Sequence, residues 1–326
     1  MEISELYRLS LLHFLGPIQE LLDDPSVTEV MVNGPQRIYY ERGGKIFESP
    51  HAFHSEDQLL SAVLNIAEYV DRPLSQENLS MDARLPDGSR VHVILPPVAR
   101  SGICLTIRKF HASGYTLDEL VRIQSIRPEG AALLEQAISE HKNLIVSGGT
   151  GTGKTSLLNA LSQKIDPRER IVVIEESSEL RLHQPHTVYL EARAESTEET
   201  QAFTVRDLFV NSLRMRPDRI IVGEVRRGEA LELVQSMLSG HSGSLATLHA
   251  SSPQTAAIRL ETLCMMSDVQ LPVYVARAQV AAAIDIIVQV TRTSTGHRRI
   301  SEIAELIELD DANRYRWKTL YRDAGE

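Results

Sequence analysis

The chain has 326 residues, 42% of them hydrophobic and 24% charged, which is the composition of a soluble globular protein long enough for two ordinary domains. Its net charge of -10 argues against a general nucleic-acid or anionic-membrane binder, because such proteins usually present a basic face to phosphate. There is no apolar run long enough to span a bilayer and no convincing secretion signal, and Cys104 and Cys264 are too isolated for a disulfide framework or a zinc site. We therefore expect a cytoplasmic protein that contacts a membrane only through partners.

The first third of the chain predicts a small α+β domain over residues 1–110. Apolar residues at helical spacing predict helices over 4–22 and about 55–70. Around them, β-branched and aromatic runs alternate with the Asn, Gly and Pro clusters that are typical of hairpins. The expected strands are Thr28–Val32, Arg37–Glu41, Lys45–Phe47, Asp82–Leu85, Ser89–Leu95 and Ile103–Arg108. We interpret residues 111–127 as a linker that contains one short helix.

From residue 128 onward, strands and helices are expected to alternate, which predicts an α/β domain with a parallel sheet covered by helices. The expected strands are Leu144–Val146, Ile171–Ile174, Thr187–Leu190, Ile220–Val222, Ser244–Leu248, 285–291 and 298–308. The expected helices are Thr155–Gln163, Thr204–Met215, Gly228–Leu238, 253–266 and 273–283.

A phosphate-binding motif lies between the first strand and the first helix of this domain. The residues GGTGTGKT at 148–155 fit the P-loop pattern G-x-x-x-x-G-K-[ST] in the context that supports it. Glycines let backbone N–H groups surround a phosphate, and the helix N-terminus adds its positive dipole end. We expect ATP to bind here, with Lys154 at the β- and γ-phosphates and Thr155 on Mg²⁺. The expected nucleotide-binding residues are Gly148, Gly149, Thr150, Gly151, Thr152, Gly153, Lys154, Thr155 and Ser156.

Acidic residues follow two of the buried strands. Glu224 comes just after Ile220–Val222, at the Walker B position, where it could hold Mg²⁺ through water or polarise the attacking water. Glu175 ends the strand Ile171–Ile174 and is the candidate general base. His249 follows a strand that is preceded by glycines and is a candidate γ-phosphate sensor, although a lone histidine at such a place is more often a satisfied core residue.

Arginines are candidates for stabilising the charge of a transferring phosphoryl group, in cis or from a neighbouring subunit. One cluster surrounds the Glu224 strand, and Arg90 and Arg108 lie on expected strands of the first domain. The alternative is that these side chains form ordinary surface ion pairs. The clustered residues are Arg214, Arg216, Arg219, Arg226 and Arg227.

Four phrases of the sequence resemble one protein family: VSGGTGTGKTSLLNAL, IVVIEESSEL, LRMRPDRIIVGEVRRGEALELVQSM and GHSGSLATLHASSP. They are similar to the hexameric ATPases of bacterial type II/IV secretion systems and type IV pilus machinery. Three phrases of the first domain resemble the branch that serves tight-adherence (Flp) pili: VTEVMVNGPQRIYYERGGKI, DARLPDGSRVHVILPP and LTIRKF.

This resemblance implies a PAS-like α+β domain, a flexible linker and a RecA-like ATPase domain over 128–326, with six copies in a ring. Such a hexamer hydrolyses MgATP and acts on an inner-membrane platform protein to power pilus assembly or protein secretion. The resemblance implies these catalytic residues: Lys154 in the P-loop, Glu175 in the acidic box, Glu224 in Walker B, His249 in the histidine box, and Arg90 and Arg108 as first-domain arginines that reach the phosphates.

Two other interpretations stay open at this point. Related motors serve conjugation or move DNA, although the acidic charge and the absence of a basic, aromatic stripe disfavour direct nucleic-acid contact. A non-catalytic scaffold, in which ATP only orders the ring, is the second alternative.

Overall fold

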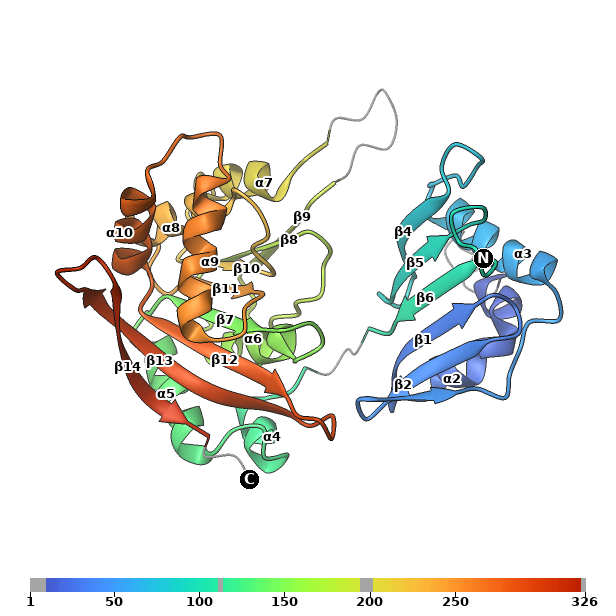
Figure 1. Ribbon diagram of the computed structural model, residues 1–326, viewed down its shortest axis with the longest axis horizontal. Coiled ribbons are helices and arrows are strands. Elements are labelled where there is room, and N and C mark those ends of the chain that lie inside the picture. The colour runs from blue at the N-terminus through green and yellow to red at the C-terminus, as the bar shows by residue number, and fades with distance from the viewer. Residues whose placement is uncertain (1–9, 111–113, 194–201, 324–326) are drawn as a thin grey trace. The chain divides into compact units, whose positions relative to one another are not determined.

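The structure of the protein is a computed structural model that describes residues 10–110, 114–193 and 202–323. The chain forms two compact units, Met1–Ala112 and Ser113–Glu326, which are drawn in Figure 1. Within the described ranges, no helix is both long and apolar enough to cross a membrane.

The first unit is built on a six-stranded antiparallel sheet with the order β3-β2-β1-β6-β5-β4. Alternate residues of its central strands, such as Val30, Val93 and Leu105, are buried in one core with Leu59 and Ile66 of helix α3. This two-residue period explains why the strands could be predicted. The elements are η1 Gly16–Ile18, α2 Gln19–Asp23, β1 Val27–Asn33, β2 Ile38–Arg42, β3 Lys45–Glu48, α3 Glu56–Tyr69, β4 Ser80–Arg84, β5 Arg90–Ile94 and β6 Cys104–Arg108.

The prediction of one continuous helix over 4–22 is wrong in its described part. Residues 10–14 are helical, a 3-10 turn follows at Gly16–Ile18, and α2 begins only at Gln19. Pro17 explains the break, because it has no N–H to donate to the preceding turn and its ring clashes there. Residues 4–9 lie outside the described part of the chain.

The second unit contains an eight-stranded sheet with the order β14-β13-β12-β7-β11-β10-β8-β9. The six strands from β12 to β9 are parallel, and β13 and β14 extend the sheet as antiparallel strands. The elements are α4 Leu117–Arg122, α5 Pro128–Ser139, β7 Leu144–Gly148, α6 Lys154–Ser162, β8 Ile171–Glu175, β9 Thr187–Glu191, α7 Val205–Ser212, β10 Arg219–Val222, α8 Ala230–Leu238, β11 Leu245–Leu248, α9 Pro253–Met265, α10 Val273–Ala283, β12 Ile286–Arg292, β13 Arg298–Leu309 and β14 Tyr315–Arg322.

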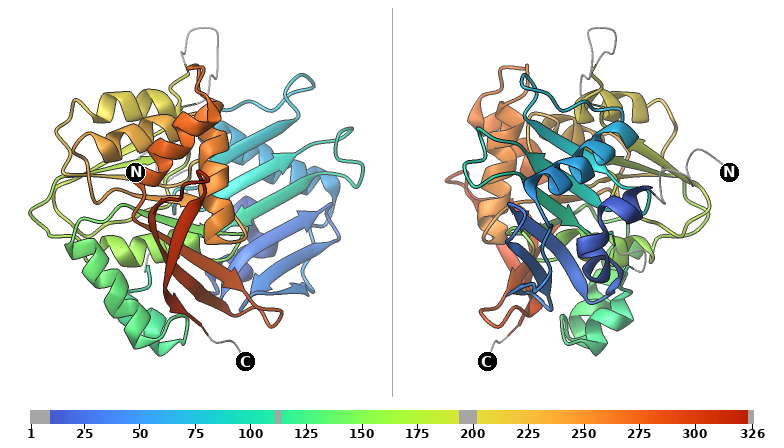
Figure 2. Two further views of the ribbon diagram at one scale, coloured as in Figure 1. Left: turned by 60° about the vertical axis from the view of Figure 1, so that its left-hand side comes forward. Right: turned by 90° about the vertical axis from the view of Figure 1, so that its right-hand side faces the viewer.

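Helices cover both faces of this sheet (Figure 2). Helices α4, α5 and α6 share one core with Leu144 and Val146 of β7, whereas α7 to α10 share the other with Ile145. The central strand is therefore apolar on both sides, as expected for a parallel sheet. The predicted α/β architecture is confirmed.

Two elements of this unit, α5 and β14, were not predicted. Helix α5 starts with Pro128 in its first turn, a position that proline favours, so this residue begins a helix where the sequence suggested the end of a linker. Strand β14 alternates half-buried aromatic residues with exposed basic ones over residues 315–318, a two-residue period that the sequence analysis overlooked. The one short helix expected within 111–127 is α4, and it places Leu117 and Leu120 in the core of the second unit.

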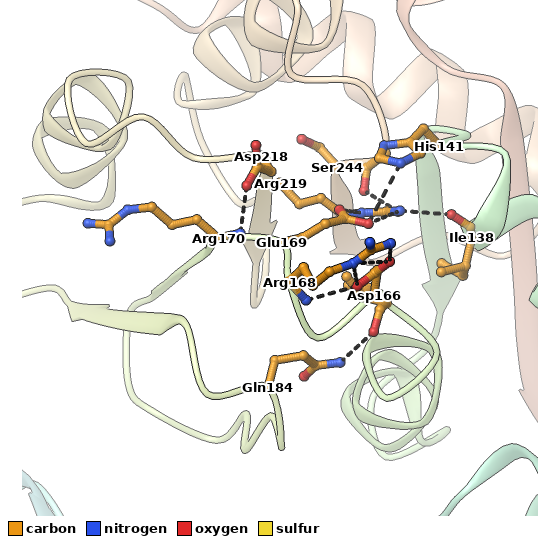
Figure 3. Close-up of polar contacts among 12 residues, drawn as sticks. Ile138, His141, Asp166, Arg168, Glu169, Arg170, Gln184, Asp218, Arg219 and Ser244 are labelled. Atoms are coloured by element: carbon orange, nitrogen blue, oxygen red, sulfur yellow. Dashed lines mark hydrogen bonds and ion pairs between the residues drawn. The ribbon is translucent and has the colours of Figure 1, made fainter.

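A buried arginine holds together the amino ends of the parallel strands (Figure 3). Arg219, at the start of β10, is 1% exposed. Its guanidinium pairs with both carboxylate oxygens of Glu169 before β8, and donates to the carbonyls of Ile138 (2.9 Å) and Gly243 (3.3 Å). Arg219 therefore lies at the opposite end of β10 from Glu224, and its contacts join segments that precede three strands.

Replacing Arg219 with Ala should destabilise the second unit by about 3–5 kcal/mol, because it leaves the Glu169 carboxylate and two carbonyls without their partner. Urea unfolding curves would measure the loss. Arg214→Ala, at an exposed position of the same arginine cluster, is the matched control and should change stability little. Equal stability of the two variants would contradict this role for Arg219.

Candidate functional site

The turn between β7 and α6 is shaped like a cradle for an anion. Gly151 and Gly153 adopt positive φ angles of 67° and 95°, which residues with side chains rarely adopt. At Gly148 a Cβ atom would lie 2.6 Å from Oγ1 of Thr152 and 2.5 Å from the carbonyl oxygen of Val290. The turn thus requires glycine at three places, and it ends at the N-terminus of α6. These features fit a bound phosphate.

The Lys154 side chain is folded into this turn. It is 8% exposed, and its ammonium donates to the carbonyls of Gly148 (3.2 Å) and Gly149 (2.9 Å). Its Nζ also lies 3.5 Å from Nε2 of His249, which follows β11. A positive charge is therefore held between the cradle and the neighbouring strand end.

A row of charged and polar side chains crosses the carboxyl edge of the sheet. Nε2 of His249 lies 2.6 Å from Oε1 of Glu224, which follows β10. Arg226 donates to the other oxygen of Glu224 and also pairs with Glu176, which follows β8. The row His249–Glu224–Arg226–Glu176 thus runs from β11 to β8, and Lys154 adjoins its His249 end.

The surroundings of His249 disfavour its protonated form. Partial burial lowers its pKa below the ordinary value of 6.5, and the charge of Lys154 lowers it further. Arg226 and Arg259 act in the same direction, whereas the Glu224 carboxylate raises the pKa. The net shift is downward, so the imidazole is neutral near pH 7 and can accept or donate one hydrogen bond.

Two carboxylates lie at the end of β8 and in the loop that follows it. Glu175 is buried and Glu179 is half-buried. Glu175 is 4% exposed, and its Oε1 accepts hydrogen bonds from the backbone N–H groups of Glu179 (2.8 Å) and Leu180 (3.0 Å). Glu179 instead accepts a hydrogen bond from the Thr155 hydroxyl at 3.0 Å. Glu175 therefore shapes the loop that brings Glu179 to the helix start at Thr155.

Two residues that the sequence analysis did not select are close to the P-loop. Glu179 is the third acidic residue of the segment that begins with Glu175 and Glu176 at the end of β8. This run of acidic residues was the signal that could have identified it. Arg298 begins β13, and its Nε donates to the carbonyl oxygen of Gly151 at 2.9 Å. No sequence pattern links residue 298 to residue 151. Their proximity follows from the pairing of β12 with β7.

Arg90 and Arg108 belong to the first unit, whereas the other candidate residues belong to the second. The two arginines are direct cross-strand partners of β5 and β6, and Arg84 of β4 is opposite Arg90 on the other side. Three arginines thus lie in one row across three strands. On the other side of Arg108, Glu29 of β1 is its direct cross-strand partner, so the row of arginines ends beside an acidic residue.

The residues present fit a magnesium nucleotide. Within the described ranges, no group of three or more His, Cys, Asp or Glu side chains is arranged to hold a metal ion. Magnesium in nucleotide sites typically uses only one or two protein ligands together with phosphate oxygens and water. The Thr155 hydroxyl at the helix start and the Glu224 carboxylate at the strand edge can serve such an ion.

A family model described as Type II/IV secretion system protein matches residues 13–322. This chain belongs to the type II/IV secretion system protein family. One relative is a Mycobacterium tuberculosis protein that carries the provisional name of conjugal transfer protein. It is 34% identical to this chain over 301 residues, which cover 90% of this chain and 85% of that protein. The type IV secretion system protein PtlH of Bordetella pertussis is 36% identical over 317 residues, covering 89% and 93%. VirB11 of Brucella suis is 32% identical over 321 residues, covering 89% and 88%.

Solved structures show the same fold for this secretion-family chain. The Legionella pneumophila ATPase DotB superposes with a TM-score of 0.63 at 18% identity, covering 88% of this chain and 79% of that one. The pilus retraction motor PilT with bound ADP gives a TM-score of 0.62 at 18% identity, covering 96% and 85%. The predicted combination of a RecA-like domain with a smaller N-terminal domain is confirmed.

Proposed function

We propose that this chain is an ATP hydrolase that powers pilus assembly or protein secretion across the bacterial envelope. The observation that supports this most strongly is the contact between the phosphate cradle and the sheet edge. Lys154 Nζ is 3.5 Å from His249, and His249 is 2.6 Å from Glu224. A cradle for phosphate thus has a histidine and a carboxylate beside it, and hydrolysis of a terminal phosphate depends on such groups to position the metal and the attacking water.

The side chains of this site would act by positioning and by electrostatics. Residues 148–156 would bind the phosphates through backbone N–H groups, with Lys154 at the β- and γ-phosphates. Mg²⁺, when bound, would neutralise charge on the phosphates. Thr155 and Glu224 would hold that ion and its water, and neutral His249 would sense the γ-phosphate from the β11 side.

The water-activating base is assigned by comparing two carboxylates. The Oε1 atom of Glu175 already accepts two backbone hydrogen bonds from its own loop, so this buried carboxylate is engaged in holding the loop. Glu179 accepts a hydrogen bond from the Thr155 hydroxyl at 3.0 Å, beside the place where the γ-phosphate and magnesium would be. We therefore propose Glu179 as the base and Glu175 as the residue that positions its loop.

The wider assembly is proposed from the family relationship. Six copies would form a ring in which Arg90 and Arg108 reach the nucleotide of a neighbouring subunit. The ring would be cytoplasmic, attached at the inner membrane through a platform protein, and the first-domain phrases favour a tight-adherence pilus. The name of the Mycobacterium relative suggests transfer of DNA, but the net charge of -10 favours a protein cargo over direct nucleic-acid contact.

Lys154→Ala should lower the rate of phosphate release by at least about 100-fold, because it removes the charge aimed at the phosphates. Its melting curve should stay near that of the wild type. DNA added to the wild-type protein should leave the rate unchanged, and stimulation by DNA would favour a motor that acts on DNA. A Lys154→Ala variant with near wild-type turnover would refute the proposed ATP site.

Glu179→Gln should bind MgATP normally and lose turnover by about 100-fold or more, since the amide keeps the size of the side chain but cannot take a proton. Glu175→Gln keeps an acceptor oxygen for both backbone N–H groups and should retain a larger share of activity. Single-turnover hydrolysis with parallel nucleotide-binding measurements tests both variants. The opposite ranking would assign the base to Glu175.

Hydrolysis should fall steeply when the protein is diluted, because each site would need arginines from a second subunit. Arg90→Ala and Arg108→Ala should each lower the rate by about 100-fold or more. Mixing the Arg90→Ala variant with the Lys154→Ala variant should restore part of the activity, because some sites would then combine intact halves. A diluted monomer with full specific activity would exclude the shared site.

A further inference from the structure

Two arginines form a direct cross-strand pair at the end of β12 and the start of β13. Arg292 is paired with Arg298 in the β12–β13 ladder, and the turn between them is closed by hydrogen bonds between Thr293 and His297. On its other side β12 pairs with β7, where Val290 is opposite Gly148. The arginine pair therefore lies just beyond the point where β7 enters the P-loop.

Both side chains reach the P-loop itself. Arg298 donates from Nε to the carbonyl oxygen of Gly151 at 2.9 Å. A Cβ atom built on Gly151 would lie 3.6 Å from Nη1 of Arg292, and one on Gly153 would lie 3.5 Å from Cδ of Arg298. Both arginines are half-buried. Arg292 and Arg298 therefore border the P-loop from the β12 side, each at one of its glycines.

The order of the strands indicates which part of a nucleotide would meet this pair. Strands β11 and β10, which lead to His249 and Glu224, lie on one side of β7, and β12 lies on the other (Figure 1). The terminal phosphate would face Lys154 and His249. The opposite end of the molecule, with its α-phosphate and ribose, would then extend toward β12.

We propose that Arg292 and Arg298 form a second anion subsite, which binds the α-phosphate and the ribose hydroxyls of the nucleotide. This inference rests on the proposed function, since it extends the same site. Guanidinium groups suit the role because they donate several hydrogen bonds in a planar fork. The subsite would make the protein select nucleotides over inorganic polyphosphate, which has no ribose and no esterified phosphate.

Isothermal titration of Arg292→Gln and Arg298→Gln with MgATP, MgADP and magnesium pyrophosphate tests the subsite. Each variant should bind ATP and ADP about tenfold more weakly, as for one lost charge-assisted hydrogen bond. Pyrophosphate affinity should not change, because pyrophosphate has only two phosphates and can fill the β- and γ-positions without reaching the subsite. Arg299→Gln is the control, because adjacent strand residues point to opposite faces and Arg299 pairs with Asp323 at 2.9 Å. This control should bind all three ligands like the wild type.

Arg292→Lys and Arg298→Lys keep a positive charge but not the planar fork, so they should recover part of the ATP affinity. Such recovery would show that the loss in the Gln variants is not due to misfolding. Unchanged ATP and ADP affinity in the Gln variants would overturn the subsite. An equal loss of pyrophosphate affinity would overturn it too, because the arginines would then serve the shape of the P-loop. Wild-type protein that binds none of the three ligands would instead overturn the proposed function.

Discussion

The absence of space for a side chain at residue 148 is the constraint on which the rest of the site depends. A Cβ there would meet both the Val290 carbonyl of β12 and the Thr152 hydroxyl. Glycine lets the end of β7 lie directly against β12 while the loop turns back over it. The buried Gln289 reinforces this junction, since it accepts a hydrogen bond from Ser147 and donates to the carbonyl of Ala250 at 3.2 Å. The P-loop, β12 and the segment after His249 are thereby one rigid piece.

Much of this arrangement could be predicted because the chemistry follows the strand ends. In a parallel sheet, the carboxyl ends of all strands meet at one edge, so residues that follow separate strands come together in space. Lys154, Glu224 and His249 are far apart in the sequence, yet Glu224 and His249 closely follow strands of one sheet, and Lys154 begins the helix after a third strand. The glycine positions of the P-loop were equally visible, because positive φ angles and close backbone approach demand that residue.

The remaining features depend on through-space contacts that no spacing reveals. The hydrogen bonds of the Glu175 carboxylate are made to backbone N–H groups, which carry no residue-specific signal. Arg298 reaches Gly151 only because β12 pairs with β7 and β13 then turns back. Arg219 and Arg226 are close in the sequence, but Arg219 lies at the amino end of β10 and Arg226 lies beyond its carboxyl end. The break at Pro17, by contrast, could have been found from the sequence with closer attention to helix interiors.

The row His249–Glu224–Arg226–Glu176 has a consequence for how this edge responds to substitution. Glu224 shares its two oxygens between His249 and Arg226, and Arg226 is in turn shared with Glu176. Removing one member changes the charge and the hydrogen bonds that its neighbours experience, so we expect the effects of substitutions along the row to be coupled. Free-energy changes measured one residue at a time along this row will not be additive, and double-mutant cycles are needed to apportion them. A motion that shifts the end of one strand therefore alters the electrostatics at all three.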